Sequence, residues 1–117
     1  MKILLLEDDV ALSDLLNEHL EDKGYEVTLC TNGQDALESL IEKKYDMALL
    51  DINTPILSGI DVLKTIRKDY KNNTPAIILT AYQDTKHLKE SFENGVDDYI
   101  KKPFDLEELD QRILKLC

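Results

Sequence analysis

The chain is poor in the residues that mark several classes of protein. Its 117 residues include no tryptophan, two cysteines, three prolines and four glycines. The two cysteines, Cys30 and Cys117, show neither a disulfide framework nor the spacing of metal ligands, which fits a reducing cytosol. The apolar run from Ile3 to Leu6 is too short for a signal peptide, and no run approaches the length of about 20 residues that spans a bilayer. We therefore expect a cytoplasmic protein that does not enter a membrane.

Positive charge is also scarce. Fourteen lysines and arginines stand against 24 acidic residues, for a formal net charge of −10. Such a field repels nucleic-acid phosphates and anionic lipids, so the chain should not bind DNA by itself, and an anionic ligand would need a cation beside it. With 43% hydrophobic residues, residues 1–117 are sufficient for one domain with a sizeable core.

Strand and helix patterns alternate along the chain. Apolar or alternating runs predict strands at 2–6, 25–30, 47–50, 75–79 and around 99–100. Apolar residues at helical spacing predict helices over 12–20, 36–41, 58–71, 88–92 and 106–116. This alternation, without low-complexity linkers, favours an α/β fold in three layers, with a doubly wound parallel sheet of five strands. The (βα)5 pattern is typical of flavodoxin-like folds, whose known strand order is 2-1-3-4-5, and we expect that order here.

Polar residues follow the predicted strands at the points where each strand ends. All strands of a parallel sheet end at the same edge, where the ligands of open α/β sheets bind. Taken singly, an aspartate that turns the chain or a solvated acidic loop would explain each position. Together the acids would repel one another strongly unless a divalent cation joined them, and an oxygen-only ligand set suits Mg²⁺. The residues at this edge are Glu7, Asp8 and Asp9, then Asp51, Thr80 with Ala81, and Lys102 with Pro103.

This set of groups suits phosphoryl transfer. With Mg²⁺ neutralising the incoming oxygens, the Asp51 carboxylate can attack phosphorus in line and form an aspartyl phosphate. Lys102 would pair with one phosphoryl oxygen, Thr80 would donate a hydrogen bond to another, and backbone N–H groups after Asp51 would hold the third. We therefore interpret Asp51 as a phosphoacceptor.

The sequence resembles the receiver domain of bacterial two-component response regulators over essentially its whole length. The matching segments are Ile3 to Asp9, Leu49 to Pro55 with Ser58-Gly59, Ile78 to Ala81, and Asp97 to Phe104. The resemblance implies that Asp51 accepts its phosphoryl group from a sensor histidine kinase. It also implies that Asp8 and Asp51 ligate Mg²⁺ through their side chains, Asn53 through its backbone carbonyl and Glu7 through a water molecule, while Asp9 is not a ligand.

The resemblance also implies a conformational switch. Thr80 corresponds to the switch hydroxyl, Tyr99 to the switch aromatic residue and Lys102 to the phosphate-binding lysine, with a cis peptide bond between Lys102 and Pro103. Phosphorylation would draw Thr80 toward Asp51, and Tyr99 would turn into the vacated space. Tyr82, two residues after Thr80, is a further candidate, as a bulky side chain that slows hydrolysis of the aspartyl phosphate.

Within that family the chain resembles the OmpR/PhoB subfamily, whose receivers form homodimers and regulate transcription through a C-terminal DNA-binding domain. The implied dimer interface contains Asp97, Asp98, Glu108 and Arg112, although Glu108 and Arg112 are also spaced for a pair within one helix. Leu88 stands at the position of the fourth predicted helix where this subfamily usually carries a basic residue. The chain contains no such effector domain, so it is expected either to be the receiver of a transcription factor or to act alone through protein contacts.

Two other classes are less consistent with these residues. A haloacid-dehalogenase-like phosphatase needs a second carboxylate two residues after its nucleophile, where this chain has Asn53. A flavodoxin needs a hydroxyl-rich loop after its first strand, where Glu7 to Asp9 would repel the flavin phosphate. Away from the strand ends, we expect His19 and His87 to be surface residues and Cys30 to lie in or near the core.

Overall fold

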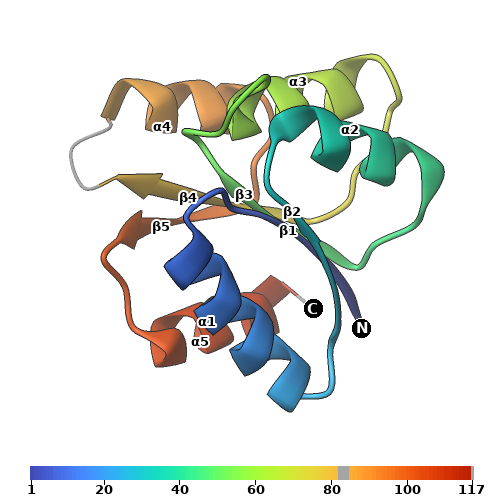
Figure 1. Cartoon of the computed structure of the whole chain (residues 1–117). Coiled ribbons are helices and arrows are strands. Elements are labelled where there is room, and N and C mark those ends of the chain that lie inside the picture. The colour runs from blue at the N-terminus through green and yellow to red at the C-terminus, as the bar shows by residue number, and fades with distance from the viewer. Residues whose placement is uncertain (82–84, 117) are drawn as a thin grey trace.

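The computed structural model describes residues 1–81 and 85–116, so Tyr82 and Cys117 lie outside the described residues. Strands and helices alternate as predicted (Figure 1). The strands are β1 (Lys2–Leu6), β2 (Glu26–Cys30), β3 (Met47–Asp51), β4 (Ala76–Ala81) and β5 (Asp98–Lys102). The helices are α1 (Val10–Asp22), α2 (Gly33–Glu42), α3 (Gly59–Lys68), α4 (Thr85–Glu93) and α5 (Leu106–Leu116).

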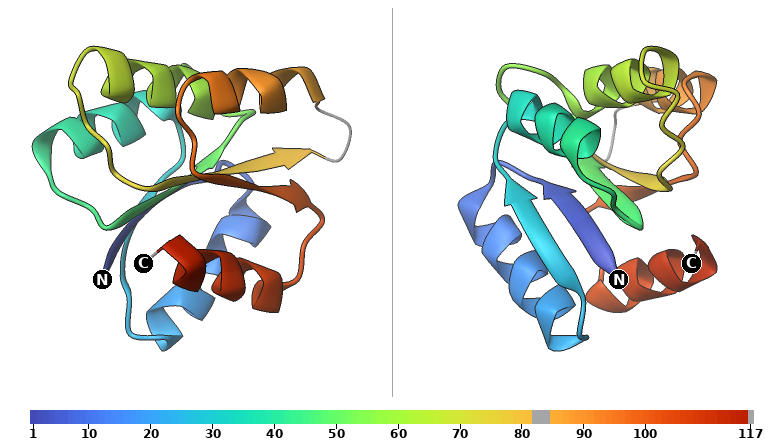
Figure 2. Two further views of the ribbon diagram at one scale, coloured as in Figure 1. Left: turned by 180° about the vertical axis from the view of Figure 1, so that it is seen from behind. Right: turned by 90° about the vertical axis from the view of Figure 1, so that its right-hand side faces the viewer.

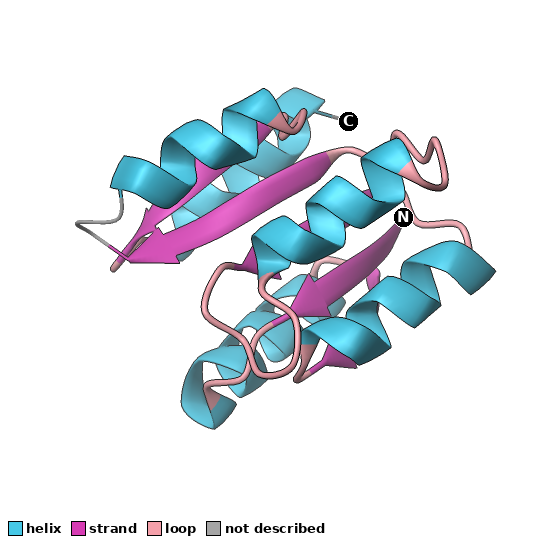
Figure 3. Cartoon of the chain, turned by 90° about the horizontal axis from the view of Figure 1, so that it is seen from above, coloured by secondary structure: helices cyan, strands magenta, loops and turns pink. Residues whose placement is uncertain are grey.

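The five strands form one parallel sheet in the order β2-β1-β3-β4-β5, as expected. Helices α2, α3 and α4 cover one face of the sheet and α1 and α5 cover the other, as the views from behind and from the side confirm (Figure 2). Seen from above, α2, α3 and α4 lie side by side over the strands (Figure 3). The fold therefore has the predicted three layers.

Each face of the sheet has its own hydrophobic core, because alternate residues of a strand point to opposite faces. Leu4 and Leu6 pack toward α2 and α3, whereas Ile3 and Leu5 pack toward α1 and α5. Strand β3, at the centre of the sheet, is buried along its whole length. A central strand covered on both faces holds its last residue, Asp51, in a fixed position.

Three helices begin at side-chain caps. Amides in the first turn of a helix have no partner within the helix, and a side chain just before the helix can accept from one of them. Such bonds run from the amide of Leu12 to Asp9, from that of Asp35 to Asn32 and from that of Asp61 to Ser58. The pair Asn32-Gly33 is typical of hairpin turns. Here it begins α2 instead, as the helical spacing after it predicted.

Helix α3 is held to the start of β5 by Arg67. Its guanidinium donates to the carbonyl oxygens of Gly95 and Asn72 and lies 3.4 Å from an oxygen of Asp97. Helix α3 also forms an ion pair with α4, between Lys64 and Glu90. The contacts of Arg67 therefore tie this layer of helices to the segments that precede β4 and β5, and the ion pair joins two helices within the layer.

His19 is less exposed than the surface position that the sequence suggested. Its side chain is only 21% exposed, and its Nε2 atom lies 2.8 Å from Oδ1 of Asp110. The contact joins α1 to α5, and Lys23 Nζ lies 3.1 Å from the other oxygen of Asp110. The prediction was wrong because the distant Asp110 covers His19 in the fold. Cys30 is buried, as expected.

Candidate functional site

Strand register brings the predicted polar residues to one edge of the sheet. Leu6 of β1 is paired with Leu50 of β3, so Glu7 follows directly beside Asp51. On the other side of β3, Asp51 is paired with Leu79, the residue before Thr80. At the next strand Ala81 is paired with Lys102. Four segments that are remote in sequence therefore meet around the end of β3.

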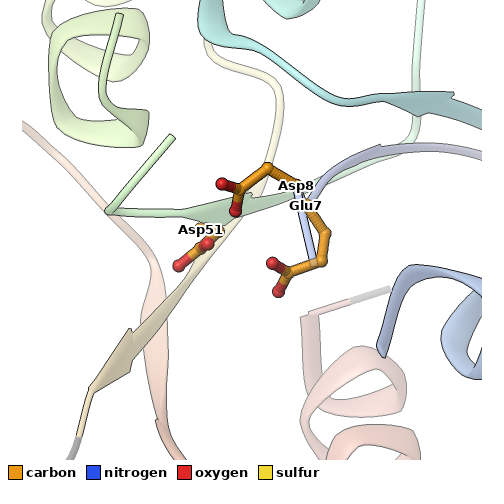
Figure 4. A group of neighbouring side chains, drawn as sticks. All are labelled: Glu7, Asp8 and Asp51. Carbon is orange, nitrogen blue, oxygen red and sulfur yellow. The ribbon is translucent and has the colours of Figure 1, made fainter. Parts of the chain in front are cut away.

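Three carboxylates form a cluster at this edge. One oxygen from each of Glu7, Asp8 and Asp51 lies within 4.8 Å of the other two. Figure 4 shows the three carboxyl groups gathered where β1 and β3 end. Glu7 is fully buried and Asp51 is 5% exposed, whereas Asp8 faces solvent. The cluster could hold a metal ion, with Asp8 on the solvent side.

Lys102 is the cation beside these acids. Its Nζ atom donates to Oε1 of Glu7 at 2.7 Å and lies 3.3 Å from Oδ1 of Asp51. Although burial opposes protonation, the hydrogen bond to Glu7 and the charges of Asp51 and Glu7 raise the pKa of Lys102. The sequence placed Lys102 at this edge but missed its pairing with Glu7, since residues so far apart carry no local signal of contact.

The acidity of Asp51 is strongly perturbed by its surroundings. Burial of its carboxyl group and the negative charge of Glu7 raise the pKa of Asp51 to about 7, and Lys102 opposes that rise only in part. Two carboxylates beside one ammonium are an unbalanced set of charges. A further cation at this position would favour the ionised, nucleophilic form of Asp51.

Thr80 and Tyr99 lie on the same face of the sheet. Tyr99 is paired in register with Ile78, and Thr80 comes two residues after Ile78, so their side chains project toward the layer that contains α4. The buried Thr80 hydroxyl donates a long hydrogen bond of 3.3 Å to the carbonyl of Ala81. The Tyr99 ring packs edge-on against Phe92 of α4, with the ring centroids 5.6 Å apart.

The four residues assigned to a dimer interface have partners within the chain. Asp97 accepts from the backbone amide of Ala76, and Asp98 accepts from Arg112, each at 2.8 Å. Nη2 of Arg112 lies 3.5 Å from Glu108, one helical turn away on α5. The intrahelical alternative for Glu108 and Arg112 is therefore confirmed, while their role between subunits stays a prediction.

Two features of the backbone complete the site. The Lys102–Pro103 peptide bond is cis, as expected. Gly59 begins α3 directly behind Asp51, where a Cβ atom would lie 2.3 Å from the Asp51 carbonyl oxygen. Beside Lys102, a groove of about 550 Å³ opens between α1 and the segment after β5, and Asp9 and Ala81 also line it.

Known proteins share both the sequence pattern and the fold of this chain. The transcriptional regulatory protein CrdR of Helicobacter pylori is 46% identical over 112 residues, which cover 96% of this chain and 53% of CrdR. The receiver domain of Francisella response regulator 1452 is 36% identical, with a TM-score of 0.90, over 98% of this chain and 94% of that one. Response regulator TrrA of Thermotoga maritima, solved in complex with Mg²⁺ and BeF, is 35% identical, with a TM-score of 0.87, over 99% of this chain and 98% of TrrA.

The curated relatives are longer than this chain, which spans about half the length of CrdR and of the regulatory protein DltR of Streptococcus agalactiae. The transcriptional regulators among them agree with the resemblance to the OmpR/PhoB subfamily. Among the described residues, no helix is both long and apolar enough to cross a bilayer. Residues 3–114 match the response regulator receiver domain, and the chain belongs to that family.

Proposed function

We propose that residues 1–117 form a cytoplasmic receiver domain that accepts a phosphoryl group on Asp51 from a sensor histidine kinase. The observation that carries this proposal is the buried end of β3, where the carboxyl group of Asp51 lies beside Glu7, Asp8 and the ammonium of Lys102. The domain acts on itself as a phosphoacceptor, in agreement with its family, rather than as an enzyme with a separate substrate.

Mg²⁺ fits the donors at this edge. The acidic cluster supplies only oxygen atoms and carries more negative charge than Lys102 can balance. The side chains of Asp8 and Asp51 and the backbone carbonyl of Asn53 would bind the ion directly, and Glu7 would bind it through water. When bound, Mg²⁺ would neutralise the phosphoryl oxygens that approach Asp51.

The residues of the chain would then carry out the transfer. A carboxylate oxygen of Asp51 attacks phosphorus as the bond between phosphorus and the nitrogen of the kinase histidine breaks. Lys102 exchanges its contact with Glu7 for one with a phosphoryl oxygen. The hydroxyl of Thr80 gives up its weak hydrogen bond to the carbonyl of Ala81 and donates to another phosphoryl oxygen instead.

The movement of Thr80 would couple the site to an output surface. It opens space on the face of the sheet where Tyr99 packs against Phe92 of α4. Tyr99 would turn inward, and the surface formed by α4, β5 and α5 would exchange between two packings. For the output itself we propose regulation of transcription through a DNA-binding domain outside this chain, as the names of the curated relatives suggest. Action as a stand-alone regulator through protein contacts is the alternative.

Intact mass after incubation with acetyl phosphate and Mg²⁺ tests this function. We expect one added phosphoryl group on the wild-type chain, and none on Asp51→Asn or in the absence of Mg²⁺. Asp9→Asn is the matched control, since Asp9 is the neighbouring acid outside the cluster and caps α1, a role that asparagine also fills. Equal phosphorylation of Asp51→Asn would refute the assignment of the phosphoacceptor.

Phosphorylation is also proposed to promote a homodimer through Asp97, Asp98, Glu108 and Arg112. These side chains would have to exchange their contacts within the chain for contacts with a partner. In sedimentation experiments the phosphorylated wild-type chain should dimerise, whereas Arg112→Ala should accept the phosphoryl group and stay monomeric. A fully phosphorylated wild-type chain that remains a monomer would contradict this interface.

A further inference from the structure

The segment between Asp51 and α3 closes on itself through local hydrogen bonds. The Thr54 amide donates to the carbonyl of Ile52, and its hydroxyl donates to the carbonyl of Leu57 at 2.7 Å. The amide of Leu57 donates to the carbonyl of Pro55, and the amide of Gly59 donates to that of Ile52. We call residues 52–58 the acceptor loop. It contains Asn53, whose carbonyl belongs to the proposed Mg²⁺ site.

The acceptor loop is braced from outside by the first residue of α2. The amide of Gly33 donates to the carbonyl of Pro55 at 3.1 Å. A Cβ atom on Gly33 would lie 1.9 Å from the carbonyl oxygen of Leu57 and 2.6 Å from its Cβ atom. No residue other than glycine can hold this contact without displacing the loop, because real Cβ atoms do not approach so closely.

The tip of the same loop has a backbone conformation that its side chain disfavours. Ile56 has a φ of 73° and is 75% exposed, although a β-branched residue rarely occupies the left-handed region. The side chain gains little from packing, so the contacts on either side of Ile56 must hold the conformation. Those contacts are the hydrogen bond of Thr54 to Leu57 and the bracing of Pro55 and Leu57 by Gly33.

We infer that Gly33 is a positioning residue for the phosphoacceptor site: by its close contact with Pro55 and Leu57, it sets the acceptor loop so that the carbonyl of Asn53 and the carboxylate of Asp51 can bind Mg²⁺ together. This inference rests on the proposed function. Gly33 begins α2, whereas the proposed ligands lie on β3 and in loops, and it acts only through the backbone of the acceptor loop. A substitution at Gly33 that displaces the loop should therefore weaken Mg²⁺ binding more than it lowers the stability of the fold.

Mg²⁺ titration of three variants tests this role. Gly33→Ala should raise the dissociation constant for Mg²⁺ about tenfold, in the range known for residues that orient metal ligands. Thr54→Val removes the hydroxyl that holds the Leu57 carbonyl without adding bulk, and it should raise the dissociation constant by a smaller factor. Gly24→Ala is the matched control: Gly24 has a φ of 87°, with no atom within 4 Å of its added Cβ, so alanine there strains the backbone far from the site.

Calorimetric titration at a temperature where each protein is folded separates affinity from stability. Gly24→Ala should melt at a lower temperature than the wild type and bind Mg²⁺ within about twofold of it, since only the fold is affected. If Gly33→Ala does not fold, Thr54→Val decides the outcome. Wild-type affinity in Thr54→Val and in any folded Gly33→Ala would overturn the role of Gly33. A wild-type chain that binds no Mg²⁺ would instead refute the proposed function, and this inference with it.

Discussion

The metal-free protein should become more stable at pH 8 when Asp51 is replaced by asparagine, by about 2 to 4 kcal/mol in the free energy of unfolding. Burial and the charge of Glu7 raise the pKa of Asp51 from 3.8 to about 7 in the folded state, whereas the unfolded chain exposes the carboxyl to water. Ionised Asp51 therefore opposes folding. The isosteric amide removes that charge, and urea denaturation measures the gain.

The dependence of this gain on pH has a definite sign. Below about pH 4 the carboxyl is protonated in both states, so Asp51→Asn changes stability little. Between about pH 4 and 7 the unfolded chain has lost the proton that the folded chain retains, and the wild-type protein loses stability as the pH rises. The full difference is present above about pH 7. A stability difference that does not change between pH 4.5 and 8 would contradict the raised pKa.

Mg²⁺ should relieve the same repulsion. At pH 8 it should raise the melting temperature of the wild-type protein and raise that of Asp51→Asn less, because the variant has lost both a ligand and the charge that the ion neutralises. Asp9→Asn, which removes one exposed negative charge outside the cluster, should respond to Mg²⁺ as the wild type does. Equal gains in Asp51→Asn and the wild type would count against repulsion as the cause.

The opposite result is expected when the cation of the site is removed. Lys102→Met should lower the stability of the metal-free protein at pH 8 by about 2 to 4 kcal/mol, somewhat less than for a fully buried ion pair, since Lys102 is 25% exposed. The variant leaves the fully buried Glu7 and the nearly buried Asp51 without the ammonium that contacts both. Lys101→Met is the matched control, because the adjacent Lys101 side chain is exposed.

Mg²⁺ should then stabilise Lys102→Met more than it stabilises the wild-type protein. With the ammonium absent, the divalent ion replaces the positive charge that Lys102 supplied to the cluster of Glu7, Asp8 and Asp51, and it meets no repulsion from Lys102. Thermal melts with and without Mg²⁺ measure the difference. A smaller gain in Lys102→Met than in the wild-type protein would show that Lys102 helps to hold the metal site together rather than competing with the ion.

Local patterns in the sequence were sufficient to predict the order of the elements. The apolar run of β3 and the polar Asp51 at its end reflect burial on both faces of a central strand, and this pattern is readable within a few residues. Once the sheet is parallel, Glu7, Asp51, Thr80 and Lys102 must come to one edge. The prediction of His19 as a surface residue was wrong because its environment depends on Asp110, which is remote in sequence.

The sequence by itself determined which groups meet at the end of β3, because the alternation of strands and helices specifies a parallel sheet and a parallel sheet has only one carboxyl edge. The tertiary structure decided how those groups are paired. The contact of Lys102 with Glu7, the complete burial of Glu7 and the bracing of the Leu57 carbonyl by Gly33 all depend on distances of a few ångströms between different elements. Such distances follow from the packing of helices onto the sheet, which no local pattern encodes.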